Sequence, residues 1–133
     1  MAEILFKELS FAIVGAAMEV HNQLGPAFLE AVYQKSLSYE LAQRGIAFEA
    51  QKALPVYYKD QLVGEYRADF VVEDKVVVEI KSVPALAKAH EAQALHYLAA
   101  TGLQLALILN FGTPSLQHQR IARSLPRAQP NSR

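Results

Sequence analysis

The sequence contains no cysteine and no long apolar run, and each absence excludes a class of protein. Without cysteine the chain has neither a disulfide framework nor thiolate chemistry. The four histidines, at positions 21, 90, 96 and 118, lack the Cys/His clustering that a structural zinc site needs. The uncharged apolar stretch at residues 11–18 is too short to span a bilayer, so we expect no membrane partner.

Acidic residues are missing from the last part of the chain, although the formal net charge is zero. All 13 Asp and Glu residues precede residue 92, whereas the segment after it carries four arginines. A nucleic-acid binder usually shows a basic patch, and only this segment offers one. We interpret it as a solvated chain end, disordered over residues 126–133, in preference to a phosphate contact by Arg120, Arg123 and Arg127.

The remaining composition indicates one globular domain, which we expect at residues 1–125. The hydrophobic fraction of 52% is too high for a disordered chain, and 133 residues leave little room for a second core. Near the start, the charged residues Glu3, Lys7 and Glu8 are unlike a signal or transit peptide. A cytoplasmic protein is therefore the expectation.

Apolar spacing predicts two helices, three strands, a helix and a final strand. Residues 4–24 and about 27–44 show helical periodicity, and Gly25-Pro26 separates them because proline cannot continue a helix. Pro55 favours an edge position for the first strand, and the run Val76-Val77-Val78 favours a central position for the third. A helix joins the last two strands, so we expect that pair to be parallel in a mixed α/β sheet flanked by helices. The expected strands are residues 46–58, 62–72, 75–83 and 103–110, with a helix at 84–101 and a short amphipathic piece at 116–125.

Three charged residues interrupt the apolar strands. Glu79 and Lys81 lie two apart in the third strand, so they project from the same face. Asp69 lies in an equally apolar part of the second strand. A three-residue turn at residues 73–75 would place Asp69 opposite Glu79, whereas a two-residue turn would put them on opposite faces. The sequence therefore makes a testable prediction about the register.

These residue types point to a metal site. Two neighbouring carboxylates repel each other, and a divalent cation such as Mg²⁺, or Mn²⁺ in its place, relieves the repulsion. A water on the metal could then attack a phosphodiester, with Lys81 positioning that water or neutralising the transition state. The alternative is a buried ion pair between Lys81 and one acid, which would leave the other acid uncompensated. We favour the metal site.

Polar side chains on the helices extend this candidate site. Glu30 and Tyr33 are three apart and share a helix face, with a solvated acid and a core tyrosine as the equally weighted alternative. His90, Gln93 and Tyr97 form one stripe on the later helix, which alone would suggest a solvent face. Gln93 gains interest only if this helix packs beside the carboxylates.

Several stretches together carry a resemblance to a known family. They are LGPAFLEAVY at residues 24–33, YRADF at 66–70, VEIK at 78–81, HEAQ at 90–93 and LNFG at 109–112. In these stretches the chain resembles the GxxExxY family, a branch of the PD-(D/E)XK nuclease superfamily, and the resemblance extends from about residue 12 to 123. Ala27 replaces the glycine that opens the naming motif, a change that a helix tolerates.

The resemblance implies a fold and a set of roles. The implied fold is a restriction-endonuclease-like αβββαβ core, which the residue pattern gives after one extra N-terminal helix. Lys81 is implied to be the catalytic lysine. The other implied roles are metal ligands for Asp69, Glu79 and Glu30, orientation of substrate or water for Gln93, and site lining for Tyr33, His90 and Tyr97.

We favour a Mg²⁺-dependent nuclease that acts on DNA, as a homodimer if both strands are to be cut. The intact set of two acids and a lysine supports this hypothesis, whereas the neutral net charge weakens it. One alternative is a non-catalytic or regulatory binding module on a nuclease fold, which a broken acid–lysine set would indicate. The other is a hydrolase of nucleotides or small molecules, which a closed pocket would indicate.

Overall fold

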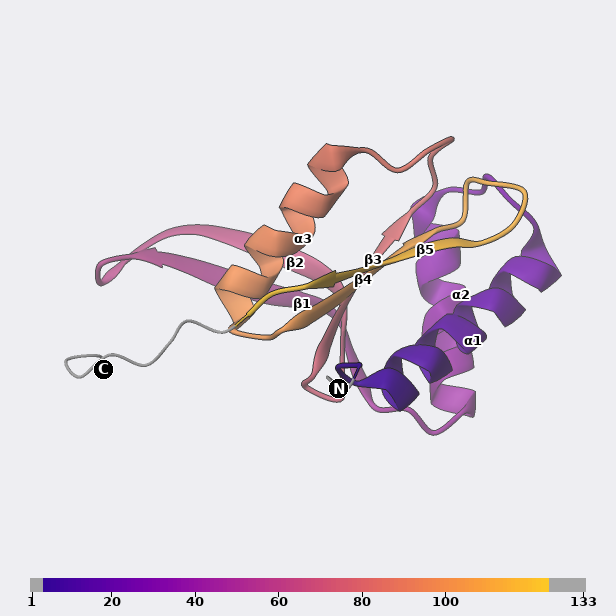
Figure 1. Cartoon of the computed structure of the whole chain (residues 1–133), viewed down its shortest axis with the longest axis horizontal. Helices are drawn as coiled ribbons and strands as arrows, with labels where there is room; N and C mark the ends of the chain where they lie inside the picture. Colours follow the sequence, from indigo (N-terminus) through magenta and orange to yellow (C-terminus); the bar gives the residue numbers. More distant parts are fainter. Residues whose placement is uncertain (1–3, 125–133) are drawn as a thin grey trace.

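The computed structural model describes residues 4–124, in which five strands form one mixed sheet with helices on both faces (Figure 1). The strand order across the sheet is β1-β2-β3-β4-β5. The expected disordered tail, residues 126–133, lies outside the described residues. The elements are α1 (Lys7–Leu24), α2 (Glu30–Gln43), β1 (Phe48–Tyr58), β2 (Gln61–Val72), β3 (Val76–Lys81), α3 (Lys88–Thr101), β4 (Leu105–Asn110) and β5 (Gln117–Ala122).

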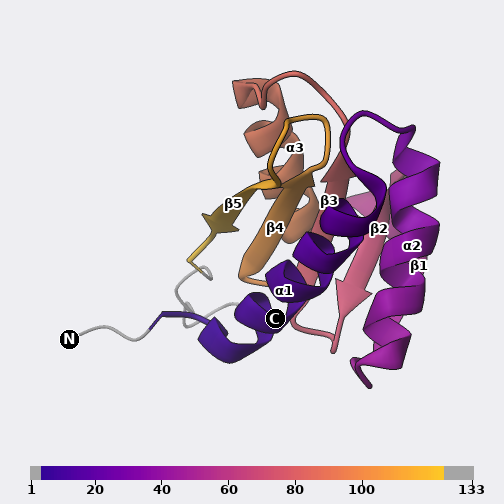
Figure 2. The same ribbon diagram turned by 90° about the vertical axis from the view of Figure 1, so that its right-hand side faces the viewer.

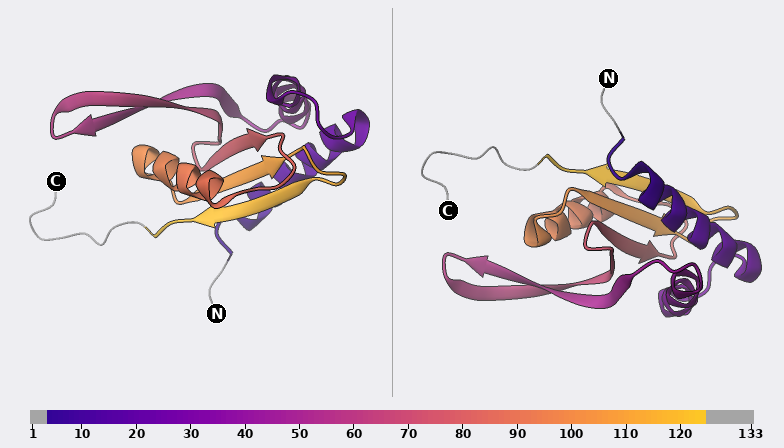
Figure 3. Two further views of the ribbon diagram at one scale, coloured as in Figure 1. Left: turned by 90° about the horizontal axis from the view of Figure 1, so that it is seen from above. Right: turned by 90° about the horizontal axis from the view of Figure 1, so that it is seen from below.

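The pairing of the strands confirms the predicted topology. β3 and β4 are parallel, and the other neighbouring pairs are antiparallel. β1 lies at an edge, as Pro55 predicted, and the central strand β3 is buried over residues 76–80. β2 pairs with β3 only over residues 70–72. The rest of the long β1/β2 hairpin therefore extends beyond the sheet, as Figure 3 shows.

The helices cover the two faces of the sheet unequally. α1 and α2 lie over one face, where Phe70, Val78 and Leu107 are buried beneath them (Figure 2). α3 covers the other face, above Val77 and Ile108. Between residues 4 and 124, no helix is long and apolar enough to cross a membrane. The expected cytoplasmic location stays a prediction.

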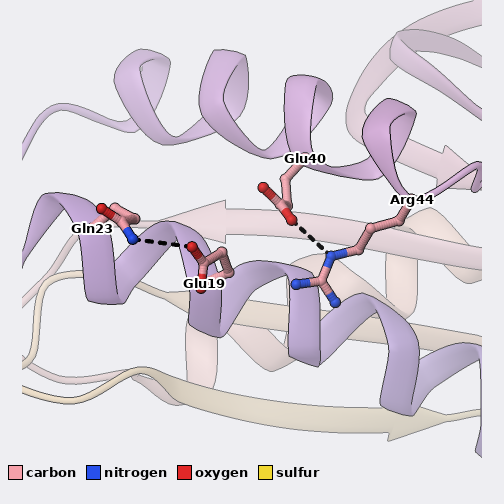
Figure 4. A network of polar contacts seen from close by, with 4 residues as sticks. All are labelled: Glu19, Gln23, Glu40 and Arg44. Atoms are coloured by element: carbon pink, nitrogen blue, oxygen red, sulfur yellow. Dashed lines mark hydrogen bonds and ion pairs between the residues drawn. The ribbon is translucent and has the colours of Figure 1, made fainter.

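α1 and α2 pack through an apolar seam. Figure 4 shows the polar side chains at the rim of this seam. In the rim, Gln23 donates a hydrogen bond to Glu19 on α1, and Arg44 pairs with Glu40 at 2.8 Å at the end of α2. Such exposed pairs one turn apart contribute about 0.3–0.5 kcal/mol each. The buried seam therefore contributes most of the stability of this helix pair.

Asn110 joins the loops that follow β3 and β4. Its buried amide oxygen accepts hydrogen bonds from the N–H groups of Val83 and Gly112, and its NH₂ donates to the carbonyl of Val83 and to Gln117. The loops cross so closely that a Cβ atom on Gly112 would lie 2.3 Å from the Val83 oxygen. Only glycine fits there. The hydrogen bonds of Asn110 hold the two loops together and fix the end of β3 that carries Lys81.

Several elements differ from the predictions. α2 begins at Glu30 and not near residue 27, because Ala27 has a left-handed φ of 70° and donates its N–H to the Phe111 carbonyl. The helix expected from residue 84 begins at Lys88, after a loop. The piece expected at residues 116–125 is a fifth strand, β5, because it completes the edge of β4.

Two arginines of the C-terminal segment donate hydrogen bonds to other parts of the fold. Arg120 donates to the Ser10 hydroxyl and to the Leu5 carbonyl, which ties β5 to the start of the chain. Arg123 donates to the Leu98 carbonyl near the end of α3. These two arginines therefore do not belong to a frayed chain end, although Arg120 is solvent-exposed, and Arg127 lies outside the described residues.

Candidate active site

The turn between β2 and β3 brings two acids together. It consists of three residues, 73–75, as the metal-site interpretation required. The paired ladder of the two strands ends with Phe70 opposite Val78. The next position on each strand places Asp69 alongside Glu79. The register prediction is confirmed.

Each carboxylate accepts a hydrogen bond from a backbone N–H group of the facing strand. Glu79 Oε2 accepts the N–H of Asp69 at 2.9 Å, and Asp69 Oδ2 accepts the N–H of Ile80 at 2.7 Å. These bonds fix both side chains where the ladder has ended. They also leave Oε1 of Glu79 and Oδ1 of Asp69 available, apart from a long 3.4 Å contact from Gln51 to Oδ1.

Burial raises the pKa values of both acids, and nearby carboxylates add to the rise. Glu79 is only 4% exposed, and burial, followed by the charge of Asp69, raises its pKa to about 8. Burial also raises the pKa of Asp69, with a smaller contribution from the charge of Glu30. The Ile80 N–H and the charge of Lys81 oppose this rise at Asp69. A site that resists holding two negative charges favours a bound cation.

Lys81 is oriented by α3 and not by an acid. Its ammonium donates to Gln93 Oε1 at 2.9 Å, so α3 does pack beside the carboxylates, the condition under which Gln93 becomes relevant. Within residues 4–124, the ion pairs closer than 4.0 Å lie at the surface, and Lys81 takes part in none of them. The alternative of a buried Lys81–carboxylate pair is therefore not what the structure contains.

The oxygen donors that the structure brings together are those of Asp69 and Glu79. Glu30 is the exposed first residue of α2, and its charge raises the pKa values of both acids, so it lies within their electrostatic reach. However, the described residues contain no group of three or more His, Asp or Glu placed to hold a metal. Two carboxylates with free oxygens fit Mg²⁺, which keeps several waters. Glu30 as a third ligand stays a prediction.

The three site-lining candidates have different surroundings. Tyr33 is buried against Phe111, with ring centroids 4.3 Å apart, and its hydroxyl bonds the loop before α2. His90 Nδ1 accepts the N–H of Ala87 and caps α3. Tyr97 is buried, and burial, then the charges of Glu79 and Asp69, raise its pKa to about 12. Of the three, Tyr97 is the one that the structure links electrostatically to the acids.

Sequence reasoning missed Gln51 and Tyr66. Gln51 lies opposite Asp69 with a φ of 53°, and the hairpin reverses its faces there. Ala68 belongs to the core under α3 and Phe70 to the core under α1 and α2, although residues two apart normally share a face. The reversal leaves Tyr66 against α3. No residue type near Gln51 signals this reversal of the faces.

Comparison with known families identifies this arrangement. The model of the PD-(D/E)XK nuclease superfamily matches residues 7–123. The chain belongs to this superfamily. The predicted restriction-endonuclease-like α/β fold is thereby confirmed, with α1 preceding the αβββαβ core and β5 following it. Nucleases of the PD-(D/E)XK superfamily generally use divalent metals, whereas membership of the GxxExxY branch stays a prediction.

One solved structure supports the fold. It is described as "Crystal structure of SSO0001" and is similar with a TM-score of 0.57 at 18% sequence identity. The alignment covers 91% of this chain and 59% of that chain, so this PD-(D/E)XK chain spans less than two thirds of that protein. The search among curated proteins found no match.

Proposed function

We propose that the protein is a Mg²⁺-dependent nuclease that hydrolyses phosphodiester bonds, with DNA as its substrate. One observation carries the proposal: Asp69 lies beside Glu79 with an oxygen of each left available, and Lys81 stands two residues further on without pairing to either acid. A bound divalent cation supplies an activated water and stabilises charge on a phosphoryl oxygen. Mn²⁺ should replace Mg²⁺.

Each residue of the site has its own role in the proposed reaction. Asp69 and Glu79 offer carboxylate oxygens to the cation, and their bonds to backbone N–H groups prevent both side chains from rotating away. Lys81 presents a positive charge towards the attacked phosphate or its water. Gln93 holds the ammonium of Lys81 in place, and Glu30 would add a third carboxylate at the start of α2.

A homodimer belongs to the proposal if the substrate is double-stranded. One chain carries one such acid–lysine set, so two copies related by symmetry would be needed to cut two strands. The rival function is a non-catalytic binding module on the same fold. Its mark would be metal binding without cleavage of any nucleic acid.

The proposal is tested by cleavage of single-stranded and duplex DNA and RNA in Mg²⁺, Mn²⁺ or EDTA. We expect cleavage in the presence of metal only, with loss of at least about 100-fold in Asp69→Asn, Glu79→Gln and Lys81→Met. Glu40→Gln is the matched control, because Glu40 pairs with Arg44 at the rim of the two helices (Figure 4). Cleavage that survives EDTA or all three substitutions would contradict the proposal, and so would a fully folded wild type that cleaves none of the substrates.

A further inference from the structure

A cleft separates the projecting part of the β1/β2 hairpin from α3. Its volume is about 330 Å³. Small apolar side chains from both elements line it, together with the rings of Tyr57, Tyr66 and His96. The lining contains neither an acid nor a lysine or arginine. The cleft is therefore suited to a flat, uncharged group and not to a phosphate or a cation.

The cleft adjoins the acids through two tyrosines. The Tyr66 ring lies 5.3 Å from the ring of Tyr97. Burial, followed by the charges of Glu79 and Asp69, raises the pKa of Tyr97. Tyr66 is also only three residues from Asp69 on β2. Three strand residues span about 10 Å, so a substrate bound at the carboxylates can extend as far as Tyr66.

The rings in the cleft are accessible and ordered relative to one another. Tyr66 is 40% exposed and Tyr57 is 61% exposed, so both present ring surface to a ligand. The planes of Tyr66 and His96 are parallel within 4°, with centroids 6.4 Å apart, although one ring comes from the hairpin and the other from α3. Exposed aromatic rings gathered at a cleft are typical of a binding surface.

We propose that this cleft binds an unpaired nucleobase, stacked on Tyr66 and Tyr57, so that the substrate is single-stranded at or next to the cut. The inference rests on the proposed nuclease function. Bases in a duplex are paired and stacked and cannot enter such a cleft without being flipped out, whereas bases of a single strand stack readily on aromatic side chains. Because no acid, lysine or arginine lines the cleft, the proposal places the base there and the phosphate at Lys81 and the metal.

The test measures binding by fluorescence anisotropy of a labelled single-stranded oligonucleotide, a duplex of the same length and an abasic strand of the same length. Ca²⁺ replaces Mg²⁺ to keep the strands intact. The variants are Tyr66→Ala, Tyr66→Phe and Tyr57→Ala. Tyr39→Ala is the matched control, because Tyr39 is 67% exposed on α2. Thermal unfolding shows whether each variant is folded.

We expect the wild type to bind the single strand more tightly than the duplex or the abasic strand. Tyr66→Ala and Tyr57→Ala should each weaken binding of the single strand roughly 5- to 100-fold, the effect of losing one stacked base. Tyr66→Phe keeps the ring and should bind normally, as should Tyr39→Ala. The abasic strand should bind all variants equally. If loss of the Tyr66 ring unfolds the protein, the Tyr57→Ala variant still tests the proposal.

Three results would overturn the inference: no binding of the single strand, tighter binding of the duplex, or single-strand affinity that is unchanged in both alanine variants. These results are separable from failure of the nuclease proposal. Metal-dependent cleavage with unchanged affinity in the tyrosine variants would reject the stacking cleft and retain the nuclease. Tyrosine-dependent binding without cleavage of any strand would retain the cleft and reject the nuclease.

Discussion

Asp69 and Glu79 lie next to each other where β2 and β3 stop pairing, and one oxygen of each carboxylate accepts a backbone N–H in place of a ladder carbonyl. The other oxygen of each remains available. This arrangement fixes two acids in a largely buried position. Among residues 4–124 neither acid forms an ion pair closer than 4.0 Å, and the charge of Lys81 offsets the rise of their pKa values only in part. Above the Glu79 pKa of about 8, the metal-free protein therefore carries an unfavourable charge pair that a divalent ion would relieve.

Glu79→Gln is expected to stabilise the metal-free protein at high pH. The pKa of Glu79 is about 8 in the folded state and 4.5 as its ordinary value, so the folded state binds more protons between these pH values. The free energy of unfolding consequently falls as the pH rises through this window. The substitution should stabilise the protein by a few kcal/mol above the window and by almost nothing below it.

Urea unfolding in EDTA, at one pH above and one below this window, measures that difference. Glutamine can still accept the N–H of Asp69, so the substitution removes the charge while keeping the hydrogen bond. An equal effect on stability at both pH values would show that burial of this charge is not the cause.

Gly112→Ala is expected to destabilise the fold by at least about 2 kcal/mol, because its Cβ would overlap the backbone of Val83. Gly64→Ala is the control: open space surrounds Gly64 in β2, and alanine there should be neutral or stabilising by about 0.5 kcal/mol. The midpoints of thermal unfolding of the two variants measure this difference in stability. Equal midpoints would mean that the loops after β3 and β4 separate at little cost.

Gln93→Ala is expected to lower the rate of cleavage about 10-fold while leaving metal affinity unchanged, since Gln93 bonds Lys81 and not an acid. A double-mutant cycle gives the specific readout. Lys81→Met combined with Gln93→Ala should be no slower than Lys81→Met alone, because Gln93 acts through the lysine. Additive losses in the rate of cleavage would assign Gln93 an independent role. Gln23→Ala on α1 serves as the control.

The parts of the fold that follow from local chemistry were predictable from sequence. The Val76-Val77-Val78 run required burial on both faces, and the three-residue turn set the register of Asp69 and Glu79. The helical connection required β3 and β4 to be parallel. Each prediction depended on a short segment whose burial or length left one solution.

The parts that depend on distant contacts were not predictable. β5 has an irregular burial pattern and is a strand because β4 offers it an open edge. The residue type of Gln51 does not signal its left-handed conformation, so the placement of Tyr66 against α3 could not be seen in the sequence. The delayed start of α2 likewise depends on a bond from Ala27 to Phe111, far along the chain.

The most direct test of the central claim, that Asp69 and Glu79 hold a divalent cation together, is calorimetric titration of Mn²⁺ and Mg²⁺ into the wild type, Asp69→Asn, Glu79→Gln and Glu40→Gln. The claim predicts binding at one site in the wild type and in Glu40→Gln, its loss in the other two variants, and tighter binding as the pH rises past the Glu79 pKa of about 8, because the proton must leave before the metal binds. Folded wild type that binds neither ion, or binding that persists unchanged in Asp69→Asn and Glu79→Gln, would contradict it.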